Sequence, residues 1–399
     1  MIADIQTEHH SFGSLDRPPY LIAEIGLNHS GQLDLARRMV DAARESGAQA
    51  AKFQLYRSRA FINPEARLSP DAAPGSLADF FAQFELRPED WHALAKHTRE
   101  QGLDFFCSVF DAPSLELYRE LDARLIKIAS CDIDNRMLFE DIKAHDPGRG
   151  PDDRAADDGA NSTSASSDAN SRPAWAVLFS SGTADQGEVE RAVSYLEAER
   201  PRGIFECVSA YPADAADYNL AVIERWREGF ACPIGISDHT TGNALSIAAV
   251  ALGARMIERH FTLDRELPGP DQALSLNPAD FANMSAAVLD VFAARGGRAK
   301  APSSAEEAPR KFGRRSIYAA RAIPAGASIA REDLIASRPG GAEGAISPAD
   351  CDGIIGRTAA AEIAENEIIR AAKLDANPTA GEGRDGANPG DVSRRGDAR

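Results

Sequence analysis

The sequence predicts an α/β protein, a (β/α)₈ barrel followed by a small β-rich domain. Eight short apolar runs typical of strands recur between residues 20 and 261, and amphipathic stretches typical of helices separate several of them. Strands that alternate with helices indicate a parallel sheet, and eight such units close into a barrel. The chain of 399 residues is long enough for this barrel and one further module.

The eight predicted strands occupy residues 20–26, 48–55, 103–110, 124–130, 174–181, 203–210, 232–238 and 255–261. The helix before the fourth run, PSLELYREL, is short, and a helix around FANMSAAVLDVFAA follows the eighth run. We therefore expect an N-terminal segment at residues 1–19 and the barrel domain at residues 20–293.

Two regions of the chain lack any hydrophobic periodicity. Residues 146–172 are rich in Gly, Ala, Ser and Asp, and residues 375–399 have the same character. Such segments bury too little apolar surface to offset their ordering entropy. We predict a disordered insertion within the barrel domain and a disordered tail. Residues 294–313 are expected to form a linker, and residues 314–374 alternate apolar and polar residues around Gly- and Pro-rich turns, which predicts the small β-rich domain.

Composition argues against several classes of function. The formal net charge of −17 would repel the backbone of a nucleic acid, so no nucleic-acid partner is expected. Five widely spaced cysteines without a CxxC pair argue against a disulfide framework or a zinc ribbon. No apolar run is long enough to span a membrane, and the N-terminus lacks the pattern of a signal peptide. These features predict a soluble cytoplasmic protein without a membrane partner.

Polar residues interrupt the predicted strands near the ends at which a barrel of this kind carries its chemistry. Charged residues inside barrel strands are costly unless they are paired or used. A salt bridge explains one inward lysine more readily than it explains a whole set of polar residues at one rim. The candidates are Glu24, Lys52, Gln54, Ser108, Lys127, Ser130, Asp132, Ser180, Ser209, Tyr211, Ser237, His239, Glu258 and His260.

The residue types in this set indicate the chemistry of the rim. Lys52 and Lys127, together with hydroxyl groups, can hold a phosphate or a carboxylate. A single histidine at a strand end is more often structural, but His239 and His260 lie on neighbouring predicted strands, each beside a carboxylate. Such a pair favours a divalent metal with positions open to substrate. Because the chain has no cysteine-rich cage, an exchangeable ion is expected rather than structural zinc.

Six motifs, AEIGLNHSG, AAKFQ, LIKIAS, SDHT, IERHFT and PGPD, occur in this order, and in order and spacing they resemble the N-acetylneuraminate (sialic acid) synthases. The later segments RRSIYAA, RPGG and IIGRT resemble the antifreeze-like (SAF) domain that follows the NeuB-like barrel of that family. The resemblance covers residues 20–374 apart from the insertion. It implies condensation of phosphoenolpyruvate with N-acetylmannosamine or a related hexosamine to a nine-carbon 2-keto acid, N-acetylneuraminate in the typical case, with release of phosphate.

The resemblance also implies a divalent metal, Mn²⁺ or Mg²⁺, and a domain-swapped homodimer in which the SAF domain of one chain covers the barrel mouth of the other. By the same resemblance, His239 and His260 are metal ligands, and Glu24 is the acid or base, with Asp132 as the second candidate. The implied contacts to phosphoenolpyruvate are Lys52, Ser108, Lys127, Ser130, Ser180 and Ser237. The implied contacts to the sugar are Glu24, Gln54, Tyr211, Asp271 and, from the partner's SAF domain, Arg338, with Ser209 as a further substrate contact.

The chain departs from the common family pattern in several places. The chain reads SCD at residues 130–132 in place of SGE, SSGT at residues 180–183 in place of STGM, and Ser209 in place of Asn. These differences could change the sugar, so a legionaminic- or pseudaminic-type synthase is an alternative. A pyruvate-dependent barrel aldolase that uses a lysine imine, and an inactive sugar-binding protein, are the other two hypotheses.

Overall fold

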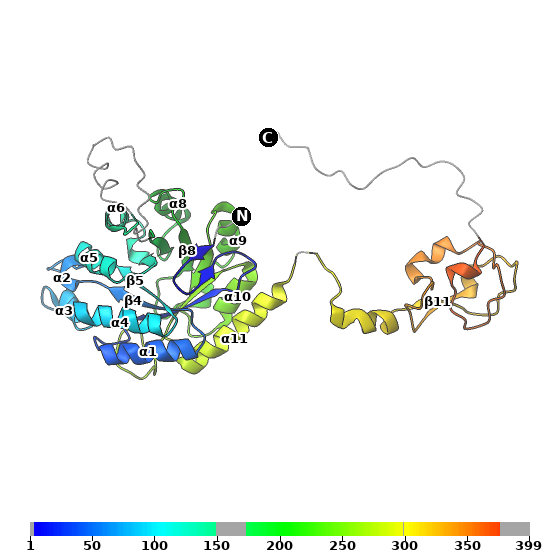
Figure 1. Ribbon diagram of the computed structural model, residues 1–399, viewed down its shortest axis with the longest axis horizontal. Coiled ribbons are helices and arrows are strands. Elements are labelled where there is room, and N and C mark those ends of the chain that lie inside the picture. The colour runs from blue at the N-terminus through cyan, green and yellow to red at the C-terminus, as the bar shows by residue number, and fades with distance from the viewer. Residues whose placement is uncertain (1–3, 149–172, 298, 376–399) are drawn as a thin grey trace, which may run out of the picture. The chain divides into compact units, whose positions relative to one another are not determined.

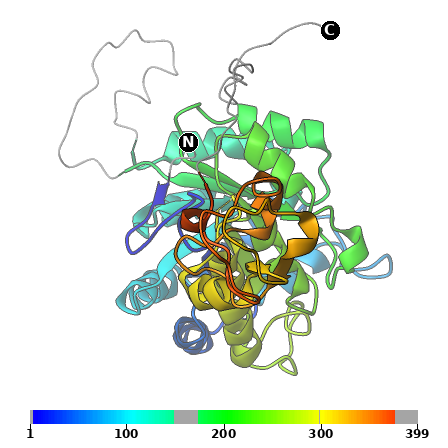
Figure 2. The same cartoon turned by 90° about the vertical axis from the view of Figure 1, so that its right-hand side faces the viewer.

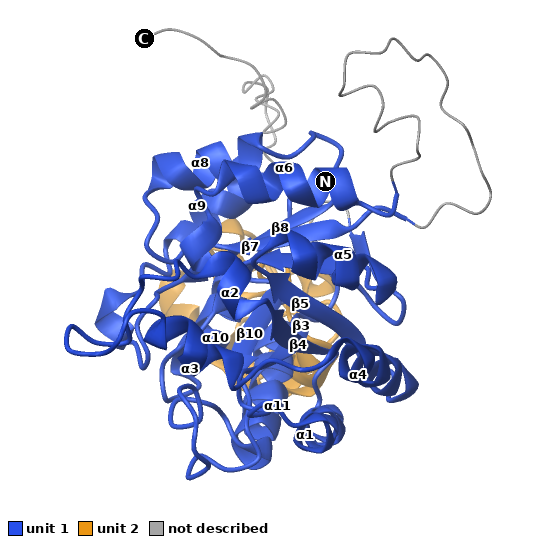
Figure 3. Cartoon of the chain, turned by 90° about the vertical axis from the view of Figure 1, so that its left-hand side faces the viewer, with its two compact units in different colours: residues 1–296 blue, residues 297–399 orange. Residues whose placement is uncertain are grey.

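The computed structural model describes residues 4–148, 173–297 and 299–375. The chain divides into two compact units, residues 1–296 and 297–399, which are coloured separately in Figure 3. The predicted insertion lies outside the described residues except for residues 146–148, and the predicted tail lies outside them except for Asp375. Asp146, at the start of the predicted insertion, is fully buried and pairs with Arg200.

Eight parallel strands form a closed barrel in the first unit (Figure 1). In sequence order they are β3 (Tyr20–Gly26), β4 (Ala50–Leu55), β5 (Asp104–Val109), β6 (Leu125–Ile128), β7 (Ala176–Ser180), β8 (Arg202–Cys207), β9 (Ile234–Ser237) and β10 (Met256–His260). Each strand pairs with the next one along the chain, and β10 closes the barrel against β3. The predicted (β/α)₈ barrel is confirmed.

A helix follows each strand and packs on the outside of the barrel wall (Figure 2). These helices are α1 (Leu33–Glu45), α4 (Pro88–Glu100), α5 (Ala112–Glu120), α6 (Arg136–His145), α8 (Gln186–Ser194), α9 (Val222–Gly229), α10 (Ala244–Leu252) and α11 (Pro278–Arg295). The β4–α4 connection adds α2 (Ser58–Phe61) and α3 (Ser76–Ala82), and short 3₁₀ turns lie at Ser130–Asp132 and Ala215–Asp217. Within the described ranges, no helix has the length and apolar character needed to cross a membrane.

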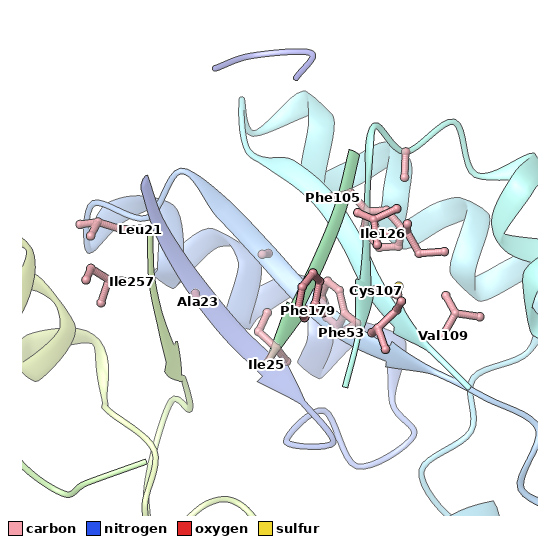
Figure 4. Close-up of a cluster of buried hydrophobic side chains, with 14 of the residues drawn as sticks. Leu21, Ala23, Ile25, Phe53, Phe105, Cys107, Val109, Ile126, Phe179 and Ile257 are labelled. Atoms are coloured by element: carbon pink, nitrogen blue, oxygen red, sulfur yellow. The ribbon is translucent and has the colours of Figure 1, made fainter. Parts of the chain in front are cut away.

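Alternate residues of each strand face opposite sides of the barrel wall, as the pleat requires. Leu21, Ala23 and Ile25 of β3 face outward and pack with Phe53 and Phe105 in the layer between strands and helices (Figure 4). The inward residues near the strand starts form a second apolar layer that includes Tyr20, Ile22, Phe106, Leu125, Leu178, Phe205 and Met256. Further along most of the strands, the inward residues are polar or charged, so the barrel is apolar at one end and charged at the other.

A short hairpin, β1 (Ile5–Gln6) and β2 (Ser11–Phe12), closes the apolar end of the barrel. The ring of Phe12 stacks on that of Tyr20 with centroids 4.0 Å apart. The hydroxyl groups of Thr7 and Tyr20 both donate to Asp104, at 2.6 Å each. Access to the interior is therefore from the carboxyl ends of the strands, where barrel enzymes carry their active sites.

The second unit has its own small apolar core. Strands β11 (Ser316–Ala319) and β12 (Leu334–Ser337) pair antiparallel, and isolated bridges such as Tyr318–Ile368 link the rest. Helical turns lie at Ser304–Glu306, Pro309–Gly313, Arg331–Asp333, Pro348–Gly353 and Ala371–Lys373. Its core residues include Ile317, Ile323, Ile329, Leu334, Ile354, Ile363 and Ile369. The predicted β-rich second domain is confirmed.

Candidate active site

Five inward-facing residues at the carboxyl ends of the strands form a buried network, which we call the ion-pair cluster: Glu24, Lys52, Lys127, Ser237 and Glu258. Nζ of Lys52 lies 2.8 Å from Oε2 of Glu24 and 3.7 Å from Oε1 of Glu258. Nζ of Lys127 lies 2.8 Å from Oε2 of Glu258, and the hydroxyl of Ser237 donates to Oε1 of Glu258 at 2.9 Å. None of the five is more than 5% exposed.

Burial and pairing set the ionisation of the cluster. Burial raises the pKa of Glu24 to about 7, against the opposing effect of the Lys52 ammonium. Burial acts against ionisation of Glu258, but Lys127 and Lys52 outweigh it and hold the pKa of that carboxyl well below its usual range. Burial lowers the pKa of Lys127, whereas Glu24 and Glu258 outweigh burial at Lys52 and raise its pKa. Glu24 is therefore the member of the cluster that exchanges a proton near neutral pH.

Three serine hydroxyls at the ends of β6, β7 and β8, those of Ser130, Ser180 and Ser209, form what we call the hydroxyl cradle. Oγ of Ser180 and Oγ of Ser209 are buried without a hydrogen-bond partner, and Oγ of Ser130 lies 3.5 Å from Sγ of Cys207. A Cβ atom on Gly182 would lie 2.2 Å from Oγ of Ser209 and 2.6 Å from Oγ of Ser130. Buried hydroxyl groups without partners are uncommon, and the oxygen atoms of an anion would satisfy them.

If the chain uses phosphoenolpyruvate, as the resemblance to the sialic acid synthases implies, replacing Gly182 with alanine should raise the KM for this substrate. The new Cβ atom would push Ser130 and Ser209 out of the cradle, and a displacement of ~1 Å in a positioning group can also lower kcat/KM by about 100-fold. Steady-state phosphate release at varied phosphoenolpyruvate measures the effect. Gly187→Ala is the matched control, because a Cβ atom there would meet nothing closer than 3.3 Å. An unchanged KM in Gly182→Ala would exclude the cradle as the anion site.

Two imidazoles lie beside the ion-pair cluster. His239 follows β9 and His260 ends β10, and their ring centroids are 5.2 Å apart. Nδ1 of His239 lies 2.7 Å from the carbonyl oxygen of Val208, so Nδ1 carries the proton and Nε2 keeps a lone pair. Nδ1 of His260 is buried without a hydrogen-bond partner, and Oδ2 of Asp271 is 3.6 Å from it. The exposed ring of Tyr211 lies 4.4 Å from that of His239.

Both imidazoles are neutral at pH 7, because burial lowers the pKa of His239 to about 4 and that of His260 to about 3. Neutral imidazole is the form that binds a metal. Across the ranges 4–148, 173–297 and 299–375, no three His, Cys, Asp or Glu side chains are arranged to hold a metal ion. Two neutral imidazoles could hold an exchangeable ion that takes water and substrate at its other positions, and they do not make a closed structural site.

Gly26 marks the point at which two further candidate residues, Gln54 and Asp271, approach Glu24. Its φ of +53° favours glycine, and a Cβ atom there would lie 3.2 Å from Oε1 of Glu24 and 3.4 Å from Oδ2 of Asp271. Nε2 of Gln54 would be 3.6 Å away, and it donates to Oε1 of Glu24 at 3.4 Å. These polar groups line the mouth next to His260. Ser108, on β5, is buried and lies beside Gln54 in the strand register.

Two candidate residues are not brought to this group by the structure. Asp132 lies in the 3₁₀ turn after β6, where Nδ2 of Asn135 donates to its carboxylate at 2.9 Å, and burial raises its pKa. The contacts of its carboxylate are therefore with its own turn, including Sγ of Cys131. Arg338 belongs to the second unit, and its contact with the sugar stays a prediction.

Two residues without an assigned role in the sequence analysis lie within the site. Glu258 pairs with both lysines of the ion-pair cluster, and Cys207 faces inward against Ser130. The spacing of two residues between Glu258 and His260 indicated a common face. The sequence did not predict that Glu258 pairs with Lys52 and Lys127, because Lys127 lies 131 residues away in the chain. Cys207 was not predicted to lie in the site either, because a cysteine in an apolar run usually behaves as a small hydrophobic residue.

A barrel whose strand ends combine two ammonium groups, a hydroxyl cradle and two neutral imidazoles defines an enzyme site for an anionic substrate. The chain belongs to the NeuB family, whose pattern matches residues 39–147 and 169–300. A SAF domain matches residues 314–375. The predicted resemblance is confirmed, and the chain is an enzyme of the sialic (nonulosonic) acid synthase family.

Proteins similar to this chain include synthases of more than one product. The N,N'-diacetyllegionaminic acid synthase of Legionella pneumophila is 31% identical over 348 residues, which cover 84% of this chain and 89% of that protein. The human N-acetylneuraminate-9-phosphate synthase is 30% identical over 364 residues, covering 90% and 93%. The crystal structure of N-acetylneuraminic acid (sialic acid) synthetase from Leptospira borgpetersenii in complex with citrate is 31% identical and has a TM-score of 0.62, covering 77% of this chain and 96% of that one.

Proposed function

We propose that this chain condenses phosphoenolpyruvate with N-acetylmannosamine or a related hexosamine and water, giving N-acetylneuraminate or a related nine-carbon 2-keto acid and phosphate. The observation that supports this proposal most directly is the meeting of the ion-pair cluster, the hydroxyl cradle and two neutral imidazoles at one rim. The first two suit a substrate that carries both a phosphate and a carboxylate. The imidazoles suit the metal-assisted activation of a second substrate.

Phosphoenolpyruvate binds at the lysines. In the free enzyme the counter-ions of Lys52 and Lys127 are Glu24 and Glu258. The phosphate and carboxylate of the substrate join or displace these carboxylates, while the hydroxyls of the cradle donate to phosphate oxygens. Because these side chains are buried and the strands fix their positions, little reorganisation accompanies the reaction.

His239 and His260 are the residues that would hold Mn²⁺ or Mg²⁺. When bound, the ion supplies Lewis-acid polarisation of the sugar aldehyde. Gln54, Tyr211 and Asp271 line the mouth on this side and orient the sugar.

The bond changes follow from this arrangement. C3 of phosphoenolpyruvate attacks the aldehyde carbon, and the aldehyde oxygen becomes a hydroxyl by taking a proton. Water adds at C2 and loses a proton, which leaves a hydroxyl beside the phosphate on that carbon. The C2–O bond to phosphate then breaks, the phosphate leaves with the electron pair and takes up a proton, and the C2 hydroxyl loses its proton to become the ketone. Glu24 moves these protons, because its pKa of about 7 lets it both donate and accept near neutral pH. Asp132, the second candidate from the sequence, is the weaker one, because its carboxylate contacts Asn135 and Cys131 in its own turn.

The sugar contacts extend to a partner chain. We propose a homodimer in which the SAF domain of one chain covers the barrel mouth of the other and delivers Arg338. Arg338→Ala should raise the KM for the sugar by about tenfold or more, the effect of losing one charge-assisted hydrogen bond, and should leave the KM for phosphoenolpyruvate nearly unchanged. Kinetics with each substrate varied in turn make the comparison. Equal effects on both KM values would exclude this placement of Arg338.

The test of the proposed function is phosphate release from phosphoenolpyruvate with Mn²⁺, using N-acetylmannosamine and, separately, a 2,4-diacetamido-6-deoxyhexose. The second sugar is included because a legionaminic acid synthase is among the similar proteins. Release that requires a sugar and stops with EDTA is expected, and the preferred sugar identifies the product. Absence of release with both sugars would contradict the proposal.

A pyruvate aldolase that works through a lysine imine is the competing reaction. Imine formation needs an uncharged amine, and Lys52, whose pKa is raised, is a poor candidate. Lys127, whose pKa burial lowers, is the better one, but its ammonium is held by Glu258. Borohydride treatment with pyruvate should therefore trap no adduct, and a trapped adduct detected by mass spectrometry would favour the aldolase.

A further inference from the structure

A second buried ion pair lies directly behind the two imidazoles. Asp238 precedes His239 and Arg259 precedes His260 in the sequence. Because side chains alternate along a strand, Asp238 and Arg259 face away from the mouth, into the layer beneath α10. Nη1 of Arg259 lies 2.6 Å from Oδ2 of Asp238, and the two residues are 1% and 0% exposed.

The carboxylate of Asp238 is saturated by nearby donors. Oδ1 accepts from the backbone N–H and the hydroxyl of Thr240, at 2.9 and 2.8 Å. Oδ2 accepts from the backbone N–H and the hydroxyl of Ser246 on α10, at 3.2 and 2.7 Å. The backbone N–H of Asp238 itself donates to the carbonyl of Glu258 at 3.0 Å. Asp238 therefore ties the turn after His239 to α10 and to β10.

The guanidinium of Arg259 holds the same turn from the other side. Nη1 donates to the carbonyl oxygen of Gly242 at 2.6 Å, and Nη2 donates to that of Thr240 at 2.5 Å. The turn at residues 240–242 directly follows His239, while Arg259 directly precedes His260. One planar side chain thus fixes the backbone next to one imidazole relative to the strand that carries the other.

The energy of burial does not explain this pair by itself. Taking two charges out of water offsets most of their attraction, and an apolar pair of similar volume is often as stable. An apolar pair could not supply directed hydrogen bonds to the carbonyls of Thr240 and Gly242 or accept those from Thr240 and Ser246. The pair therefore contributes mainly by fixing the positions of the two imidazoles. Groups behind metal ligands commonly act in this way, by orienting the ligands.

We propose that Asp238 and Arg259 are positioning residues that fix the separation and orientation of His239 and His260, and through them the affinity of the site for a divalent cation. This inference rests on the proposed role of the two histidines as metal ligands. Neither Asp238 nor Arg259 contacts the cation or the substrate.

The test measures Mn²⁺ binding directly, by electron paramagnetic resonance of free Mn²⁺, with the full chain and without substrates. Arg259→Lys keeps the charge and removes the planar fork. It should raise the dissociation constant for Mn²⁺ by roughly 10- to 100-fold. Arg200→Lys is the matched control, because Arg200 also forms a buried pair, with Asp146, next to the start of β7. Both variants should lower the melting temperature, and only Arg259→Lys should weaken Mn²⁺ binding.

The outcomes separate the inference from the proposed function. A folded Arg259→Lys that binds Mn²⁺ like the wild type overturns the positioning role alone, and so does equal weakening in Arg200→Lys. Wild-type protein that binds no Mn²⁺ overturns the metal role of the histidines. If Arg259→Lys does not fold, Thr240→Val replaces it, because that change removes one hydroxyl donor to Asp238. Thr240→Val should weaken Mn²⁺ binding several-fold, and an unchanged dissociation constant would contradict the inference.

Discussion

Replacing His260 with alanine should abolish phosphate release from phosphoenolpyruvate while the barrel stays folded. The side chain is buried, but its Nδ1 atom has no hydrogen-bond partner, so the change leaves no new unpaired group opposite that atom. The expected stability cost is that of a cavity, about 2–4 kcal/mol. The expected catalytic cost is the loss of aldehyde polarisation, worth several kcal/mol, which corresponds to at least ~10³-fold in kcat. Phosphate release and thermal unfolding followed by circular dichroism measure the two effects separately.

His29→Ala is the matched control for this variant. His29 is 0% exposed and His260 is 6% exposed, and burial lowers the pKa of His29 to about 4. The ring of His29, however, lies 6.3 Å from that of Trp91 on the outer side of the barrel wall. Its removal should lower the melting temperature and leave phosphate release dependent on Mn²⁺. Full activity in His260→Ala would exclude the metal role. Equal losses in both variants would mean that His260 acts only through stability.

Most of the barrel could be predicted because its determinants are local. In YLIAEIG the alternation of side chains assigns Leu21, Ala23 and Ile25 to the outer layer, and the same alternation places Glu24 inside. Eight such runs with helices between them leave few architectures other than a closed barrel. The N-terminal hairpin was not predictable in this way, because strands of two residues have no periodicity to detect.

The contacts within the site could not be predicted, because they depend on closure of the barrel. The spacing of residues in the sequence predicted that Glu258 faces inward. Its partners, however, lie on β4 and β6, which are distant from β10 in the sequence. The approach of Ser209 and Ser130 to Gly182 likewise depends on the stagger of three strands. Asp132 shows the opposite case. Asp132 follows a strand, so the sequence predicted that it points into the barrel mouth. The turn after the strand instead directs its carboxylate to Asn135, and the residue types around Asp132 did not indicate this direction.

The second large effect is expected for Lys127→Met, a change that keeps the length of the side chain and removes its charge. Lys127 is 1% exposed and its Nζ atom lies 2.8 Å from Glu258. Its loss leaves Glu258 with Ser237 and the more distant Lys52, at 3.7 Å. Breaking one side of a buried pair costs about 3–5 kcal/mol of unfolding free energy. The kcat/KM for phosphoenolpyruvate should fall by ~10²–10³-fold, because the loss of a buried cation that faces the substrate anion removes binding free energy that corresponds to a factor of this size.

Loss of activity in this single variant does not by itself identify the cause, because the variant is also less stable. The double variant Lys127→Met/Glu258→Gln removes the stranded negative charge as well. Its unfolding free energy, from urea titration, should recover most of the loss, since neutralising both partners is far less costly than stranding one. Lys143→Met is the control, because Lys143 forms a surface pair with Glu197 at 3.9 Å and such pairs contribute at most about 1 kcal/mol.

Activity in the double variant then shows whether Lys127 binds the substrate anion or only neutralises Glu258. If Lys127 holds the anion of phosphoenolpyruvate, the double variant should be stable and still inactive, because the positive charge opposite the substrate is gone. If Lys127 only neutralises Glu258, the double variant should regain both stability and turnover. Recovery of turnover would exclude Lys127 as a substrate contact and leave Lys52 and the hydroxyl cradle to bind the anion. A stable, inactive double variant would separate the two roles of Lys127, which are neutralising Glu258 and binding the substrate anion. The ammonium of Lys127 would then be the group that pairs with Glu258 in the free enzyme and with the anion of the substrate in the complex.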